Sequence, residues 1–178
     1  PHHSCETYIA RLIKKGYKVA ICEQMESPAA AKGVVRREIV RIVTPGTLIE
    51  SNLLDEGSNN YICCIYSSDN GYGLTFADIS TGVIRLTEAA RGDDQRLINE
   101  LGRFFPSEII FNSHFFDKEK VAKFIKTRLA CTADTARDAA FEHAGAARLC
   151  LAHFGAQSLE DLGLEDKPLA VSAVGGLL

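Results

Sequence analysis

The sequence lacks the cysteine and glycine spacings that build the common metal and phosphate sites. Its six cysteines include no C-x-x-C pair, and the histidines and cysteines near its beginning match no usual closed zinc site. The Gly175-Gly176 pair is not followed by lysine and then serine or threonine, as a phosphate-binding P-loop requires. These absences exclude a structural zinc module and a P-loop ATPase from the 178 residues.

Long apolar runs are also missing. No stretch approaches the roughly 20 apolar residues of a membrane-spanning helix, and no secretory signal peptide is recognisable. Cys63 and Cys64 are neighbours in an apolar strand pattern and should point to opposite faces, so the cysteines are interpreted as reduced thiols. With 46% hydrophobic and 24% charged residues, the composition is typical of a soluble globular protein. We expect a cytoplasmic protein and, because the first residue is not methionine, a piece of a longer chain.

Positive charge is concentrated at the beginning of the chain. Residues 1–47 carry 8 lysines and arginines against 4 acidic residues, a net of +4. The remainder carries 12 against 19, a net of -7. A local excess of cations attracts polyanions, so only the first part of the chain is expected to face one.

The pattern at residues 36–47, RREIVRIVTPGT, marks a boundary between two parts of the chain. It alternates β-branched apolar residues with Arg37 and Arg41 and then ends in Thr-Pro-Gly-Thr. This predicts a β-strand that carries cations, closed by a turn in which proline fixes φ and glycine accepts a positive φ. The residues before the turn differ in character from those after it, which indicates a domain junction.

The residues before this junction predict a small α/β unit. Its elements are a helix over 4–15, a strand over 18–23, a short helical turn over 28–31 and the long strand. Such a unit is too small to bury a core of its own. We therefore expect it to be part of a larger domain.

The residues after the junction predict an α/β layered domain. Asp69-Asn70-Gly71 and Ser80-Thr81-Gly82 are hairpin signals, so the first three strands are expected to be antiparallel, with an α-β-α-β order after them. The predicted strands are 61–67, 71–79, 82–88, 108–111 and 129–132, and the predicted helices are 93–105, 117–126, 139–154 and one that begins at 168.

Five short motifs, in this order and spacing, resemble the bacterial MutS family of DNA mismatch-repair proteins. They are GYKVAICEQ (16–24), KG (32–33), VRIVTPGT (40–47), ADISTG (77–82) and HFG (153–155). The resemblance is collinear over nearly the whole chain. It implies that 1–47 is the C-terminal part of a mismatch-recognition domain and that 48–57 is a linker. It further implies a ribonuclease-H-like connector domain over 58–165 and the start of the core domain over 166–178.

This resemblance makes basic residues within positions 1–47 candidates for contacts with the DNA backbone. Cations spaced along a surface meet phosphates without reading bases. The alternative is a solvated surface, which applies above all to a lysine pair such as Lys14-Lys15. The Phe-x-Glu motif with which the family probes a mismatch is absent, so the chain is not expected to recognise mismatches by itself. The candidates are Lys32, Arg37, Arg41, Lys15 and Arg36.

The resemblance also implies partners. In the family, the connector passes signals between the DNA end and the ATPase end and docks the protein MutL. Arg148 and Leu149, in the predicted helix 139–154, lie near the positions that align with the family's contact helix. The alternative is that Leu149 is core and Arg148 is solvated. A homodimer, ATP and magnesium are implied for full-length members only, and we expect no cofactor, metal or catalytic residue in this chain.

Two other functions stay open. A ribonuclease-H-like sheet suggests a metal-dependent nuclease, in which carboxylates gather around two metal ions, and Asp78 and Glu108 are the candidate ligands. Against this, the first strand of the domain contributes no carboxylate, and Asp78 is more simply a turn residue. The other alternative is a purely structural connector.

Overall fold

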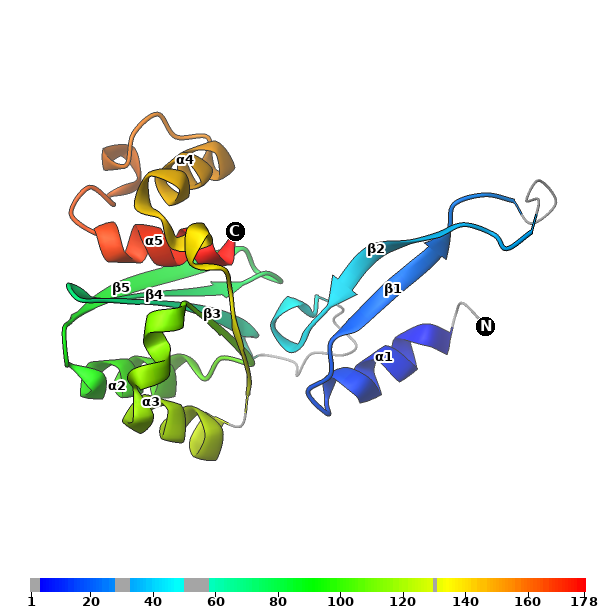
Figure 1. Ribbon diagram of the computed structural model, residues 1–178, viewed down its shortest axis with the longest axis horizontal. Coiled ribbons are helices and arrows are strands. Elements are labelled where there is room, and N and C mark those ends of the chain that lie inside the picture. The colour runs from blue at the N-terminus through cyan, green and yellow to red at the C-terminus, as the bar shows by residue number, and fades with distance from the viewer. Residues whose placement is uncertain (1–3, 28–32, 50–57, 130) are drawn as a thin grey trace.

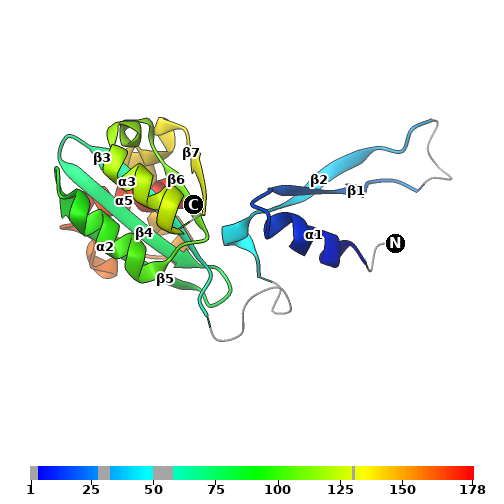
Figure 2. The same cartoon turned by 90° about the horizontal axis from the view of Figure 1, so that it is seen from below.

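The computed structural model describes residues 4–27, 33–49, 58–129 and 131–178. They form two units that lie side by side (Figure 1). The hairpin unit, the described residues up to 49, is a two-stranded sheet with one helix. The sheet unit, the described residues from 58 onward, is a five-stranded sheet with helices on both faces (Figures 1 and 2). The chain is therefore a mixed α/β protein, in line with the expectation from the sequence.

The hairpin unit confirms the helix and the two strands predicted for it. Helix α1 spans Cys5–Ile13, and strands β1 (Val19–Gln24) and β2 (Arg37–Val43) pair antiparallel. Its core is small, with Ile13, Val43 and Leu48 buried at its centre. Three large apolar side chains of β2 stay about half exposed or more, namely Ile39, Val40 and Ile42. The short helical turn predicted over 28–31 lies outside the described residues.

The turn after β2 differs from its prediction in one respect. Pro45–Thr47 form one turn of 3-10 helix, which the side chains and backbones of Thr44 and Thr47 cap reciprocally. Gly46, however, does not have a positive φ. A Cβ atom at Gly46 would lie 2.8 Å from the Ile62 Cβ and 3.0 Å from the Glu108 Cβ. Glycine is needed here for close packing against the sheet unit, not for its backbone freedom.

The sheet unit has the strand order β5-β4-β3-β6-β7. Strands β3 (Tyr61–Ser68), β4 (Gly71–Asp78) and β5 (Val83–Ala90) are antiparallel, as predicted. Strands β6 (Glu108–Phe111) and β7 (Thr132–Thr135) add in parallel next to β3. Strand β7 starts at the residue where the sequence placed its end, because a π-helical turn over Ile125–Leu129 extends the preceding helix.

Helices cover both faces of this sheet. Helices α2 (Asp94–Phe104) and α3 (Glu119–Phe124) pack on the face that carries Cys63 and Ile65. On the other face lies α5 (Pro168–Leu177), and α4 (His143–Phe154) packs on α5 (Figure 1). No helix among the described residues is long and apolar enough to cross a membrane.

Two helices depart from their sequence predictions. The predicted helix 139–154 is divided, because the Glu142 carboxylate accepts hydrogen bonds from the backbone N–H groups of Ala144 and Gly145 and begins α4 there. The helix from 168, which the sequence analysis assigned to a following domain, packs onto the sheet instead. Its residues Ala170, Val171, Ala173 and Val174 are buried. This apolar helix therefore belongs to the sheet unit and covers one face of its sheet.

Candidate functional site

The basic residues proposed for the DNA backbone lie mostly on the exposed surface of the hairpin unit. Lys15, Arg36 and Arg37 are exposed, and Arg41 is half-buried. The Arg36 guanidinium pairs with the Glu38 carboxylate, which reduces the charge that Arg36 offers to a polyanion. The remaining candidate, Lys32, lies outside the described residues.

A bulge in the hairpin separates two of these cations. In a regular strand, Arg37 and Arg41 would share a face, because they are four residues apart. The register shifts after Ile21, so that Ile21 faces Arg41 and Gln24 faces Arg37. Alternation along β1 then places Arg41 on the face that α1 covers and Arg37 on the open face. The candidate DNA-facing cations with open access are therefore Lys15, Arg36 and Arg37.

The proposed MutL-docking residues both lie on the surface of α4. Arg148 is exposed and Leu149 is 42% exposed, while Ala146 and Cys150 turn inward. The structure therefore does not support the alternative that Leu149 belongs to the core. Phe154, at the end of the same helix, is 43% exposed. An arginine beside exposed apolar side chains is a common composition for a protein interface.

The two units meet at a junction centred on the carboxylate of Glu108. Glu108 is the first residue of β6 and only 2% exposed. Its Oε2 atom accepts hydrogen bonds from the Thr44 hydroxyl and, at 3.1 Å, from the Gly46 N–H. Its Oε1 atom lies 3.0 Å from the Nζ of Lys18, the residue just before β1. One buried carboxylate in the sheet unit thus binds three groups of the hairpin unit.

A second side chain holds the same turn from the sheet unit. The Asn60 Nδ2 donates to the Pro45 carbonyl at 2.9 Å and to the Leu48 carbonyl at 3.4 Å. The Asn60 Oδ1 accepts a hydrogen bond from the Ser107 hydroxyl. The junction, defined as Lys18, Thr44, Gly46, Asn60, Glu108 and Asp134, therefore fixes both the turn and the start of β1.

Lys18 lies on the exposed side of this junction. Its Nζ lies 2.6 Å from the Asp134 Oδ2 on β7 as well as near Glu108. Partial burial lowers the pKa of a lysine, but the hydrogen bonds to Asp134 and Glu108 outweigh it and raise the pKa of Lys18. The ammonium group therefore stays charged at neutral pH and links two strands of the sheet unit to the hairpin unit.

The two nuclease candidates do not form a metal site. Asp78 pairs with Tyr61 and Glu108 pairs with Ile62, and these neighbours on β3 point to opposite faces of the sheet. Each carboxylate also has its own partners, since Asp78 accepts hydrogen bonds from Asn60 and Ser80. Within the described part of the chain, no three metal-ligating side chains gather into a group. This geometry counts against the nuclease alternative.

Asp78 instead makes a testable contribution to stability. Burial raises the pKa of a carboxyl group, but hydrogen bonds from the Ser80 side chain and backbone and from the Asn60 backbone hold the pKa of Asp78 below its usual value. Its contribution is therefore present above the ordinary pKa of about 3.9 and is lost as the pH falls through the lower folded-state value. Asp78→Asn should cost about 1–3 kcal/mol of unfolding free energy at pH 7.

Urea denaturation followed by circular dichroism at several pH values measures this effect. The difference between the parent and Asp78→Asn should shrink at pH values below about 4. Asp69→Asn provides the control, because Asp69 is an exposed acidic residue and its change should be small at every pH. A difference that stays constant down to the acid transition would contradict this account.

The fold and the site together define a two-unit α/β protein, in which a basic hairpin unit is fixed to a five-stranded sheet unit. Family models divide the chain at nearly the same place. Residues 1–52 match MutS domain I, and residues 60–178 match MutS domain II. The chain belongs to the MutS family of DNA mismatch repair proteins, as the sequence motifs predicted.

Individual relatives show the same similarity along the whole chain. The DNA mismatch repair protein MutS of Symbiobacterium thermophilum is 43% identical over 180 residues. Those of Ruminiclostridium cellulolyticum and Methanococcoides burtonii are each 40% identical over 179 residues. The matches cover 100% of this chain and 20% of each relative. The chain thus spans a fifth of the length of these relatives, and the matched parts are domains I and II alone.

Sequence reasoning missed the junction, although it singled out several of its residues. The sequence places Lys18 in a strand, offers Glu108 only as a candidate ligand of the nuclease alternative, and predicts a turn for the Thr-Pro-Gly-Thr motif. The available signal was the unusual position of a glutamate at the start of an otherwise apolar strand, Glu108–Phe111. A carboxylate there needs partners, but the sequence does not say which.

Proposed function

We propose that this chain is the contact and relay module of a mismatch repair protein. The hairpin unit supplies sequence-independent contacts with the backbone of duplex DNA, as part of a longer cytoplasmic protein that works as a homodimer. The sheet unit, a connector of ribonuclease-H-like type, transmits the state of the DNA-bound end. The described residues need no cofactor for this role, because binding and transmission involve no chemical step.

The observation that carries this proposal is the junction around Glu108. A relay requires that a displacement of one unit moves the other, and a buried carboxylate of the sheet unit that binds three groups of the hairpin unit provides such a link. The exposed cations Lys15 and Arg37 support the DNA contact, because phosphate binding needs accessible positive charge.

The surface of α4 is the proposed dock for MutL. It combines Arg148 with the exposed apolar side chains Leu149 and Phe154. Fluorescence anisotropy of the labelled chain with the amino-terminal domain of MutL tests this. Saturable binding is expected, and Arg148→Glu should weaken it about tenfold or more, because arginine is enriched among residues that dominate interfaces.

The matched control is Arg128→Glu, which reverses an exposed arginine at the end of the π-helical turn, away from α4. It should leave the affinity unchanged. If both variants weaken binding equally, net charge and not the α4 surface determines the affinity. If the parent chain does not bind at tens of micromolar, roughly the weak end of transient complexes, the docking proposal fails and a purely structural connector remains.

A further inference from the structure

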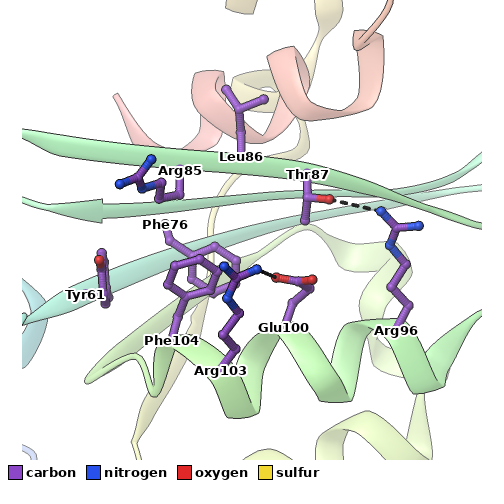
Figure 3. Close-up of a pocket in the computed structure, with 9 residues that line it drawn as sticks. All are labelled: Tyr61, Phe76, Arg85, Leu86, Thr87, Arg96, Glu100, Arg103 and Phe104. Carbon is purple, nitrogen blue, oxygen red and sulfur yellow. Dashed lines mark hydrogen bonds and ion pairs between the residues drawn. The ribbon is translucent and has the colours of Figure 1, made fainter.

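A hollow of about 580 Å³ lies between the edge strand β5 and helix α2 (Figure 3), and the proposed function does not use it. From α2, the side chains of Arg96, Glu100 and Arg103 rise toward the sheet, while Arg85 and Thr87 belong to β5. The hollow falls within the usual range of ligand sites, about 300–1,000 Å³. Its volume is large enough for several side chains of a partner.

The floor of the hollow is aromatic and rigid. The Phe104 ring stacks on the Phe76 ring at 4.3 Å between centroids and meets the Tyr61 ring edge-on at 5.3 Å. Phe76 is completely buried and Tyr61 is 8% exposed. Such a floor does not rearrange easily, so the positions of the arginines around it are set by packed elements.

The positive charge around the hollow is poorly compensated. The Arg96 guanidinium donates to the neutral Thr87 hydroxyl at 3.4 Å, and the Arg103 guanidinium lies over the Phe104 ring and 3.9 Å from the Glu100 carboxylate. The Arg85 guanidinium has no hydrogen bond or ion pair within the described part of the chain. Three guanidinium groups therefore face one carboxylate across a concave surface. This arrangement attracts an anionic ligand.

The strand that borders the hollow has a free edge. Among the residues that the structure describes, β5 pairs with β4 and with no other strand. A free edge presents unpaired backbone N–H and C=O groups, with which an extended segment can form a further pair of strands. Every second side chain of such a segment would point to the face that carries the arginines.

We propose that the open edge of β5 and this hollow together bind an extended acidic segment of a partner protein. The segment adds to the sheet next to β5 and directs alternate aspartate or glutamate side chains toward Arg85, Arg96 and Arg103. Alternate residues of a strand recur about every 7 Å on one face. Arg96 and Arg103 stand about 10 Å apart along their helix, so successive inward carboxylates meet different guanidinium groups.

An acidic peptide fits this site better than duplex DNA. The arginines stand on both walls of a hollow, whereas a duplex presents a convex ridge of phosphates that is met by cations along an open surface. The free backbone edge adds a hydrogen-bonding partner that a peptide can use and a duplex cannot.

The test uses the 178-residue chain and a fluorescein-labelled octapeptide of alternating valine and glutamate, with binding followed by anisotropy and by amide NMR shifts. Saturable binding is expected, with the largest shifts on β5 and α2. The double variant Arg96→Gln/Arg103→Gln should weaken binding about fivefold to tenfold. Both arginines are exposed, and an unchanged urea midpoint confirms that the variant is folded.

Two controls separate this site from general charge attraction. A peptide with glutamine in place of glutamate should bind much more weakly. The second control changes Arg91, an exposed arginine outside the hollow. The Arg91→Gln variant should bind the acidic peptide like the parent. Equal binding by the double variant, equal binding of the glutamine peptide, or no saturation at about 1 mM overturns the proposal. The proposal is also overturned if a short DNA duplex displaces the peptide and the binding of that duplex depends on Arg96 and Arg103.

Discussion

Gly73→Ala should lower the free energy of unfolding by about 3 kcal/mol or more, the largest effect that we expect for any glycine-to-alanine exchange in the described residues of the sheet unit. Gly73 lies in the middle of β4, where α5 crosses the sheet. A Cβ atom there would lie 1.9 Å from the Leu169 carbonyl oxygen and 2.2 Å from its carbon. Both are backbone atoms, so no side-chain rotation relieves the overlap, and the helix itself has to move.

Displacement of α5 explains the size of this effect. Val171 and Val174 are buried between the sheet and α4, and a shift of the helix exposes part of their apolar surface. Urea denaturation gives the loss in stability, and amide hydrogen exchange should show the greatest loss of protection in α5. Gly102→Ala is the matched control, because a Cβ at this position in α2 would meet only the Phe124 ring, at 3.5 Å.

In a helix interior, alanine is favoured over glycine by up to about 1 kcal/mol. Gly102→Ala should therefore leave the protein as stable as the parent or slightly more so. If Gly73→Ala behaves like Gly102→Ala, then α5 does not pack against β4 as described. The two substitutions add the same atom, so the comparison isolates the position of the helix backbone.

The close approach of α5 also shows where sequence reasoning stops. Hairpin signals and alternation predicted β3, β4 and β5, because turn residues and side-chain period are local properties. The family resemblance assigned residues 166–178 to another domain, and local patterns could not correct this, since nothing local says which surface an apolar helix covers. Gly73 interrupts a strand pattern and marks a close approach of another backbone, but the partner, Leu169, is far away in the sequence.

The candidate sites also divide into features that local sequence patterns predict and features that depend on distant residues. Basic residues and an exposed helix could be proposed from the sequence, because charge and amphipathic spacing are visible there. The separation of Arg37 from Arg41 could not, because it depends on a bulge opposite Ile21. The role of Glu108 also escaped the sequence, since its partner Thr44 lies 64 residues away. A carboxylate looks the same in a sequence whether it binds a metal or fixes a turn.

Glu108→Ala should uncouple the hairpin unit from the sheet unit and lower the free energy of unfolding by about 2–4 kcal/mol. The substitution leaves the buried Gly46 N–H and Thr44 hydroxyl without their acceptor, and hydrogen bonds to a charged group contribute about 1.5–3 kcal/mol each. Lys18 adds little to this sum, because its side chain is 42% exposed and keeps Asp134 as a partner.

The coupling itself can be measured as a distance distribution between two spin labels. Cys22, which is exposed on β1, takes one label, and Asn99→Cys, on the exposed surface of α2, takes the other, in a background with Cys5→Ser and Cys131→Ser. The parent should give a narrow distribution, because the junction fixes the two units. Glu108→Ala should broaden it, and Glu108→Gln, which keeps an acceptor for Gly46, should lie between them.

Asp134→Ala is the control that removes a charge from the same junction without breaking the link. The Asp134 side chain is 54% exposed and, among the described residues, forms an ion pair with Lys18 alone, so the cost should stay below about 1 kcal/mol and the distribution should remain narrow. A distribution in Glu108→Ala as narrow as that of the parent would show that packing of the turn, not the carboxylate, joins the units. A displacement of the hairpin would then reach the sheet through the contact of Gly46 with Ile62, and the relay would depend on shape instead of charge.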